Sequence, residues 1–176
     1  EYNEADFFFF FAALSVSGQL EGEVAAMGLG KIYTFGPSFR AEKSNTPRHV
    51  AEFWHVEPEV AFAELPDIIE IAEALIKHII NPVPETCPDE LKFFDAHSDK
   101  GLIDKLTSVA NHNFAVMTYT EAIEKLKESG EEFKYPVEWG CDLQTEHERY
   151  ITERIFKKPV FVTDYPKDIK AFYMRM

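Results

Sequence analysis

The clearest feature of the chain is a pair of runs in which apolar and polar residues alternate. Residues 31–40 (KIYTFGPSFR) form the first run, and residues 52–62 form the second after a charged, turn-rich segment. Alternation with a period of two predicts two antiparallel strands joined by a long loop. In the second run one face carries Phe53, His55, Glu57 and Glu59, and the other carries Trp54, Val56 and Pro58. Pro58 cannot donate a ladder hydrogen bond, which predicts a bulge or the end of pairing there.

A short helix is predicted just before the first strand. Ser17 takes its N-cap position, because a hydroxyl there can accept from a free backbone N–H of the first turn. Gly28 and Gly30 mark its end. The spacing predicts one apolar face made of Leu20, Val24 and Met27. The helix thus leads into the first strand through a glycine-containing turn.

The rest of the chain reads as helices with a few short strands. A strong helical period runs from Pro66 to about Ile80, and a proline-rich connection follows it. The elements predicted next are helices over 90–96, 101–110 and 120–129, a strand over 114–117, a helix over 146–156, and strands over 160–163 and 171–175. Residues 81–135 are interpreted as an inserted helical subdomain. A hairpin with helices clustered elsewhere predicts an α+β fold, an antiparallel sheet flanked by helices.

Composition narrows the class of protein. The 176 residues suffice for one compact domain, and 45% hydrophobic residues exclude a disordered chain. A net charge of −13 disfavours nonspecific attraction to a nucleic-acid backbone. Cys87 and Cys141 favour free thiols in a reducing, cytoplasmic setting over a disulfide scaffold. No stretch reaches the ~20 apolar residues of a membrane helix, so no membrane partner is expected.

The first strand ends in a group suited to bind an anion. Arg40 can donate two parallel hydrogen bonds to a phosphate or a carboxylate, and Glu42 can accept from an adenine amino group or orient Arg40. Phe53 can stack on a purine. Each has an ordinary alternative: a surface arginine, a solvated loop acid and a core phenylalanine. Together they predict a site for an anion and a purine on the sheet.

Glu57 and Glu59 are more unusual, because the alternation turns both carboxylates toward the face that carries Phe53. A carboxylate on a packed face is costly unless it is paired.

Metal sites and dinucleotide-binding sites lack support in the sequence. The six histidines show no HExxH spacing, and the Gly28-x-Gly30 pair lies between a helix and a strand, the wrong order for a dinucleotide fingerprint. No metal ligands are therefore assigned.

Several collinear segments resemble one family, the class II aminoacyl-tRNA synthetases. The segments YTFGPSFRAE (33–42), RH (48–49) and AEFW (51–54) look like motif 2 of that family, and SVSGQLEGE (15–23) resembles the amino-acid-binding turn of its aspartyl and asparaginyl branch. Three later segments are similar to asparaginyl-tRNA synthetases: EWG (138–140), EHERY (146–150) and YPKDIKAFYMR (165–175). The motif 2 region then spans about residues 31–59, and the resemblance covers essentially the whole chain.

The resemblance implies an enzyme that binds ATP, Mg²⁺, L-asparagine and tRNA(Asn). It would activate asparagine as the adenylate and transfer it to the tRNA. Arg40 would be the catalytic residue, clamping the α-phosphate and the amino-acid carboxylate. The other ATP contacts would be Glu42 and His49 along the nucleotide, Arg48 near its phosphates and Phe53 under the adenine. The amino-acid pocket would include Ser17, Gln19 and Glu57, with Glu146 and Arg175 as further candidates.

Gly22 bears on the choice between asparagine and aspartate. In the aspartyl branch this position holds a lysine that faces the substrate carboxylate. Without that cation the negative charge of a bound aspartate side chain has no opposite charge beside it. Glu57 would instead accept a hydrogen bond from an asparagine amide and repel aspartate. A site built to hydrogen-bond one polar group can reject an analogue by ~10⁴. The resemblance therefore implies asparagine as the substrate.

The resemblance also predicts missing parts. Motif 1, which builds the homodimer interface of the parent, motif 3 with the metal-binding acids before it, and the anticodon-binding barrel have no counterpart in the chain. We therefore expect a fragment that is inactive alone. Two alternatives stay open: an adenylate-forming enzyme that makes asparagine from aspartate, and a synthetase-like binding protein without activity.

Overall fold

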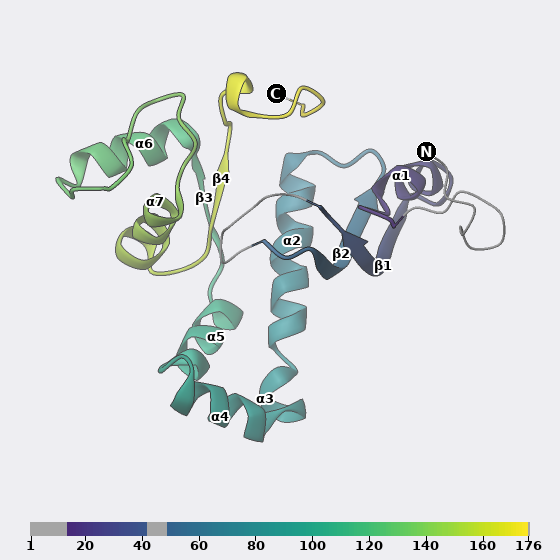
Figure 1. The fold of residues 1–176 in the computed structure, drawn as a ribbon, viewed down its shortest axis with the longest axis horizontal. Helices are drawn as coiled ribbons and strands as arrows, with labels where there is room; N and C mark the ends of the chain where they lie inside the picture. Colours follow the sequence, from purple (N-terminus) through teal and green to yellow (C-terminus); the bar gives the residue numbers. More distant parts are fainter. Residues whose placement is uncertain (1–13, 42–48, 176) are drawn as a thin grey trace. The chain divides into compact units, whose positions relative to one another are not determined.

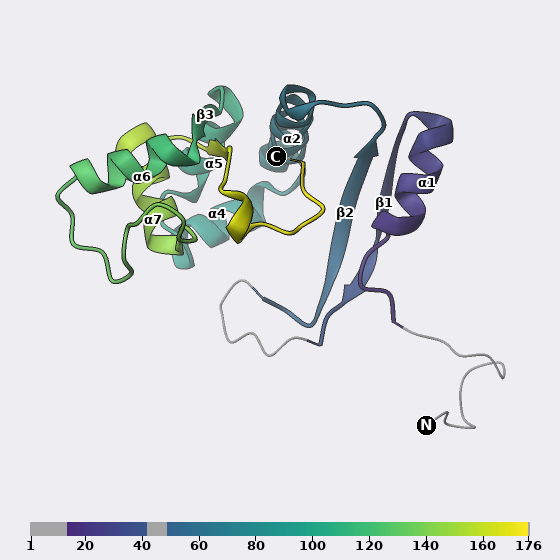
Figure 2. The ribbon, with the colours of Figure 1, turned by 90° about the horizontal axis from the view of Figure 1, so that it is seen from above.

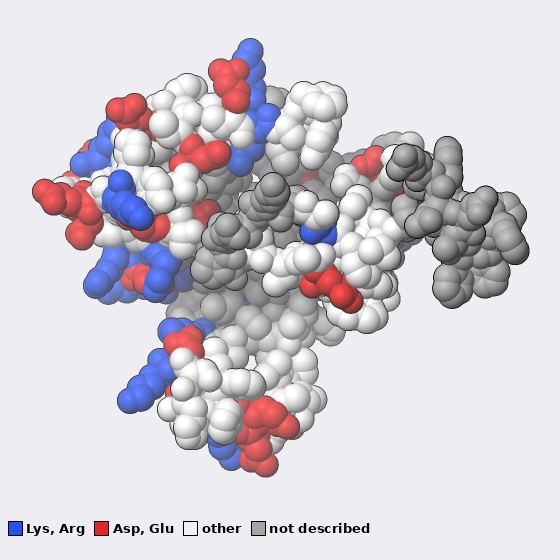
Figure 3. Space-filling view, viewed as in Figure 1, with Lys and Arg blue, Asp and Glu red and all other residues white. Residues whose placement is uncertain are grey.

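The computed structural model describes residues 14–41 and 49–175 (Figure 1). The described residues fall into two compact units, and the boundary lies between Glu64 and Leu65. The predicted α+β class is confirmed, since an antiparallel pair of strands is accompanied by several helices. On the face drawn in Figure 3, Lys and Arg side chains are interspersed with Asp and Glu. No helix in the described part of the chain has the length and apolar character to cross a membrane.

The first unit is built on the predicted hairpin. β1 (Lys31–Phe39) pairs with β2 (Glu52–Val60) in antiparallel register along its whole length, with Thr34 opposite Glu57. The predicted alternation is confirmed. The partly buried residues of β2 include Phe53, His55, Glu57 and Glu59, and the exposed ones include Trp54, Val56 and Pro58. The face that carries the carboxylates is therefore the covered face.

The predicted interruption at Pro58 is wrong. Pro58 pairs with Tyr33, and the ladder continues to Val60, which lies opposite Lys31. A proline fits into a strand where its nitrogen faces away from the partner strand. Within the described residues β1 and β2 form a two-stranded sheet, so each strand has an outer edge that tolerates a proline.

The helix α1 (Gln19–Leu29) packs on the covered face of the hairpin, as Figure 2 shows. Its predicted apolar face is not the packing face. The exposed side chains of α1 include Leu20, Val24 and Met27. The buried positions are Gly22 and Ala26. Small residues thus bring the helix backbone close to the strand side chains, where larger ones would hold it away.

The second unit begins with four helices. They are α2 (Leu65–Ile80), α3 (Val83–Thr86), α4 (Pro88–His97) and α5 (Leu102–Asn111). The predicted helices are confirmed in this region, and the proline-rich connection contains the single turn α3. A proline stands in the first turn of both α3 and α4, where its missing N–H has no intrahelical partner to lose.

The rest of the second unit contains a parallel pair of strands. β3 (Ala115–Thr118) pairs with β4 (Val160–Thr163), and the two lie side by side in Figure 1. The chain between them forms α6 (Tyr119–Glu128), α7 (Thr145–Tyr150) and a π-helix (Ile151–Phe156). Parallel strands need such a long crossover. The antiparallel arrangement thus holds for the hairpin, whereas this second pair is parallel.

These elements share a small apolar core, formed by Met117, Ala122, Leu126 and Ile151. The helix predicted over 120–129 begins one residue earlier. Thr118 caps it, and the Glu121 side chain completes a capping box. β3 and α6 fall within residues 81–135, and the insertion proposed for that range stays a prediction. The strand predicted over 171–175 is wrong, because these residues form turns after a 3₁₀-helix (Lys167–Ile169).

Candidate functional site

The Glu57 carboxylate joins the turn before α1 to the hairpin. Its Oε1 accepts from the Ser17 hydroxyl and lies 3.2 Å from His55 Nδ1. Its Oε2 accepts from the Gly18 backbone N–H at 2.8 Å and from the Thr34 hydroxyl at 3.1 Å. A carboxylate offers about four lone-pair positions, so these donors satisfy it. The structure therefore supplies the partners that an inward-facing carboxylate needs.

The pKa of Glu57 reflects these contacts. Burial raises it, but the three hydrogen bonds and the nearby His55 outweigh burial, so the net pKa lies below the ordinary value. The pKa of Glu59 is shifted in the opposite direction, because burial and then the charges of Glu23 and Glu57 raise it. Glu57 is therefore the carboxylate that the site holds firmly in its charged form.

Two glycines allow this close approach. A Cβ atom on Gly18 would lie 2.6 Å from Thr34 Oγ1 and 2.8 Å from Thr34 Cβ. A Cβ atom on Gly22 would lie 3.2 Å from Glu59 Cγ and 3.3 Å from Ile32 Cδ1. The φ angle of Gly18 is −91°, which other residues also adopt. Gly18 is thus required by lack of space and not by its backbone angle.

The predicted N-cap is displaced by one residue. Gly18 is the N-cap of α1, and Ser17 precedes it. The Ser17 hydroxyl accepts from the Gln19 backbone N–H at 3.1 Å while it donates to Glu57. The Gln19 side chain instead donates to Glu23 Oε1 at 2.8 Å, along α1. The structure therefore brings Ser17 to Glu57 and leaves the Gln19 amide on the exposed side of the helix.

Arg40 and Phe53 lie together where the hairpin strands meet the loop. Arg40 follows β1, and its backbone N–H donates to Ala51 O at 2.9 Å. Its Cζ lies 5.2 Å from the centroid of the Phe53 ring, within the range of a cation–π contact. The His55 ring contacts Phe53 edge-on, with centroids 5.4 Å apart. A purine that stacks on the ring face now covered by Arg40 would require the guanidinium to move aside.

Three other residues were predicted to contact ATP: Glu42, Arg48 and His49. Glu42 and Arg48 lie outside the described residues. His49 is exposed, in the segment that leads into β2. The structure thus brings Arg40 and Phe53 together and leaves the roles of the other three as predictions.

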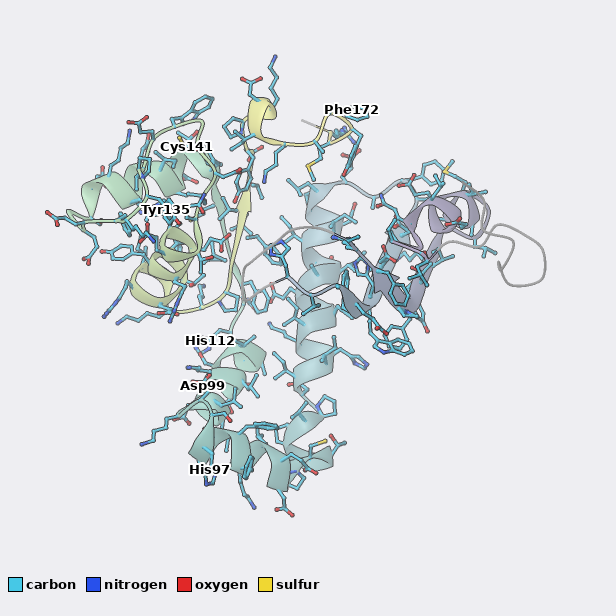
Figure 4. The ribbon with its side chains drawn as sticks, viewed as in Figure 1. His97, Asp99, His112, Tyr135, Cys141 and Phe172 are labelled. Carbon is cyan, nitrogen blue, oxygen red and sulfur yellow. The ribbon has the colours of Figure 1, made fainter. Side chains whose placement is uncertain are left out.

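Two predicted amino-acid contacts belong to the second unit. Glu146 accepts from the backbone N–H groups of Lys134 at 3.1 Å and Tyr135 at 2.7 Å. It thereby anchors the loop between α6 and α7, on which Figure 4 labels Tyr135 and Cys141. Arg175 is exposed and follows the turn over 171–174. Their part in amino-acid binding stays a prediction.

Nothing in residues 14–41 and 49–175 gathers three or more His, Cys, Asp or Glu side chains into a possible metal site. The histidines at the ends of α4 and α5, labelled in Figure 4, bond to their own helices. His97 Nδ1 lies 3.0 Å from Phe93 O, and His112 Nδ1 lies 2.7 Å from Ser108 O. Asp99 accepts from Lys105 Nζ at 2.7 Å. These side chains therefore stabilise the helices and the turn next to them.

Comparison with known proteins identifies the family. All 176 residues match the family described as tRNA synthetases class II (D, K and N). The chain belongs to this class II synthetase family. The match covers the chain as a whole, and the position of motif 2 within it stays a prediction.

Two curated relatives of this class II chain carry the same name. The chain is 62% identical to the asparagine–tRNA ligase of Clostridium novyi (strain NT), and the match covers 100% of this chain and 38% of that protein. It is 64% identical to the asparagine–tRNA ligase of Alkaliphilus metalliredigens (strain QYMF), over 97% of this chain and 37% of that protein. The chain thus spans little more than a third of the length of these relatives.

Solved class II synthetases share its fold. An asparaginyl-tRNA synthetase from Pyrococcus horikoshii, complexed with asparaginyl-adenylate, aligns with a TM-score of 0.79 and 40% identity, over 97% of this chain and 37% of that chain. An aspartyl-tRNA synthetase from Entamoeba histolytica aligns with a TM-score of 0.70 and 30% identity, over 90% of this chain and 32% of that chain.

Sequence reasoning missed three residues that surround Glu57. Gly18, Thr34 and His55 all contact or approach Glu57, yet none of them was assigned a role. A signal was present for two of them. His55 shares the covered face of β2 with Glu57, and a hairpin register would have placed Thr34 opposite Glu57. Gly18 had no comparable signal, because its contact with Thr34 arises only from packing.

Gly18→Ala should destabilise the first unit, because the added methyl group overlaps Thr34. The clash includes the Thr34 Cβ atom, which no rotamer change moves, so we expect a loss of about 1–3 kcal/mol in unfolding free energy. Gly28→Ala is the matched control. Gly28 lies in α1 with open space around it, and alanine there should be neutral or stabilising by up to ~1 kcal/mol. Denaturant titration of both variants measures the difference, and equal stabilities would contradict the packing described here.

Proposed function

We propose that this chain supplies the ATP and amino-acid site of an asparagine–tRNA ligase. The observation that carries the proposal is the identity of 61–64% with curated asparagine–tRNA ligases across nearly the whole chain. The amino-acid carboxylate attacks the α-phosphorus of ATP and pyrophosphate leaves. A terminal ribose hydroxyl of tRNA(Asn) then attacks the asparaginyl carbonyl carbon, and AMP leaves. The proposal extends to a homodimeric full-length protein in the cytoplasm, for which the free thiols of Cys87 and Cys141 are suited.

The layout of the hairpin supports this reaction. Phe53 and Glu57 lie on one face of β2, four residues apart, or about 13 Å along a strand. ATP stacks its adenine at Phe53, and asparagine lies at the other end with Ser17 and Glu57. The two reacting groups, a carboxylate and the α-phosphate, then meet within reach of Arg40. Glu42, Arg48 and His49 complete the nucleotide contacts in this proposal, and Gln19, Glu146 and Arg175 the amino-acid contacts.

Catalysis in this site depends on alignment and charge. The nucleophile is the substrate carboxylate, so the protein needs no nucleophile of its own. Arg40 presents a planar fork that can bind the α-phosphate and the substrate carboxylate at once. The described residues offer no cluster suited to Mg²⁺, so no step is assigned to the metal, which accompanies ATP in the proposed reaction.

Charge at Glu57 supports asparagine over aspartate. A carboxylate about 5 Å from a second carboxylate costs roughly 3 kcal/mol at an effective dielectric constant of 20, about a hundredfold in binding. Gly22 adds no cation to offset this repulsion. Because the donors around Glu57 hold its pKa low, the repulsion persists at neutral pH. Rejection of aspartate therefore requires that its side-chain carboxylate lie near Glu57, but it requires no direct hydrogen bond between Glu57 and the substrate.

Pyrophosphate exchange by the full-length protein tests the proposal. We expect exchange that depends on asparagine and is at least a hundredfold weaker with aspartate. Synthesis of free asparagine from aspartate and ammonia would instead support the adenylate-forming alternative. Failure to bind a nonhydrolysable asparaginyl-adenylate mimic, measured by calorimetry, would support a protein without synthetase activity.

Arg40→Ala in the full-length protein should lower the rate of asparagine activation by more than ~10², because it removes a contact to the charge that develops at the α-phosphorus. Arg154→Ala, which removes an exposed arginine from the π-helix, serves as the matched control and should retain activity. Pre-steady-state adenylate formation measures both. An Arg40→Ala enzyme within tenfold of wild type would remove Arg40 from the catalytic role.

Glu57→Gln should narrow the preference for asparagine over aspartate by roughly a hundredfold, since it removes the repelling charge and keeps the shape. Glu52→Gln is the control, because Glu52 lies exposed on the same strand. The measurement is the ratio of kcat/KM for the two amino acids. An unchanged ratio in Glu57→Gln would show that selectivity arises elsewhere.

A further inference from the structure

We infer that Thr34 is a positioning residue for the amino-acid substrate: through the Glu57 carboxylate it holds the turn of Ser17 and Gly18 in its binding geometry. The inference rests on the proposed function, because it assigns that turn to amino-acid binding. The Thr34 hydroxyl is bonded to Glu57, so its effect on the substrate passes through that carboxylate.

The contacts of Thr34 single it out on β1. Its hydroxyl donates to Glu57 Oε2 at 3.1 Å, and the same oxygen accepts from the Gly18 backbone N–H at 2.8 Å. The strand and the turn thus meet at one atom. The other carboxylate oxygen accepts from the Ser17 hydroxyl, which therefore depends on the orientation of the whole carboxylate. A change in the Glu57 rotamer would release both turn residues together.

The methyl side of Thr34 faces α1. Its Cγ2 atom lies 3.0 Å from the position of a Cβ on Gly18 and 3.5 Å from that of a Cβ on Gly22. Threonine therefore does two things at this position: the hydroxyl orients Glu57, and the branched carbon fills the space under the turn. Valine keeps the branched shape without the donor, and serine keeps the donor without the branch. These two substitutions separate the two contributions.

Steady-state kinetics of asparagine activation by the full-length Thr34→Val and Thr34→Ser proteins test the inference. We expect Thr34→Val to raise the KM for asparagine about tenfold, with kcat and the KM for ATP within twofold of wild type. In Thr34→Ser, the KM for asparagine should lie within threefold of the wild-type value. This pattern follows because the hydrogen bond to a charged acceptor is lost in one variant and kept in the other.

Thr107→Val is the matched control, since Thr107 is exposed on α5 in the second unit. It should leave all kinetic constants unchanged. Equal rises in KM for ATP and asparagine in Thr34→Val, or a Thr34→Ser variant as impaired as Thr34→Val, would overturn the inference in favour of a packing role alone. A Thr34→Val protein with wild-type KM would also overturn it. Failure of the proposed function is distinguishable, because the wild-type protein would then show no asparagine-dependent exchange.

If Thr34→Val fails to fold, calorimetry of the serine variant still tests whether the Thr34 hydroxyl positions the turn. Folded Thr34→Ser that binds a nonhydrolysable asparaginyl-adenylate mimic as tightly as wild type supports the role of the hydroxyl. Binding at least tenfold weaker in folded Thr34→Ser contradicts it, because that variant retains the donor to Glu57.

Discussion

The contact between the Glu57 carboxylate and the turn before α1 determines how the first unit is arranged. α1 rests on the hairpin through Gly22 and Ala26, while its larger apolar residues Leu20 and Val24 are exposed. Little apolar area therefore fixes the position of the helix start. The hydrogen bonds that converge on Glu57 from the turn and from β1 supply directional links in its place. Such a network is stable only when every donor and acceptor is satisfied.

The same contact links structure to the proposed chemistry. A carboxylate held ionised on a covered face gives the amino-acid end of the site a fixed negative charge, and Arg40 gives the nucleotide end a positive one. Glu57 lies on β2 and Arg40 directly follows β1, so the hairpin sets the separation of their backbones. Short, regular elements of this kind can hold reacting groups in alignment, which is the main contribution that this reaction asks of a protein.

The sequence predicted the parts of this site that depend on local periodicity. Alternation in residues 52–62 was enough to place Phe53 and Glu57 on one face, and the run over residues 31–40 placed Arg40 beside the loop. Helical periodicity predicted the wrong packing face for α1. Hydrophobic spacing favours Leu20, Val24 and Met27, whereas contact through glycine leaves no hydrophobic signal. The sequence prediction also failed at Pro58, where the outcome depends on which side of the strand faces a partner.

Other features were not predicted because they depend on long-range pairing. Nothing local in residues 115–118 and 160–163 indicates that these strands run parallel, because this depends on the path of the chain between them. The partners of Glu57 are equally nonlocal: Ser17 and Gly18 lie about forty residues away, and Thr34 lies on the other strand. Sequence reasoning could identify the need for partners at Glu57, and the hairpin pattern could have pointed to Thr34, but nothing local indicated the contacts from Ser17 and Gly18.

An NMR titration of the Glu57 side-chain carboxyl carbon tests this account most directly. In full-length protein labelled with ¹³C at glutamate, the signal is assigned by its loss in Glu57→Gln. We expect a titration midpoint below the ordinary glutamate pKa of about 4.5, because the hydrogen bonds favour the charged form. A midpoint at or above that value would mean that the carboxylate lacks these donors, and would contradict the arrangement on which the site depends.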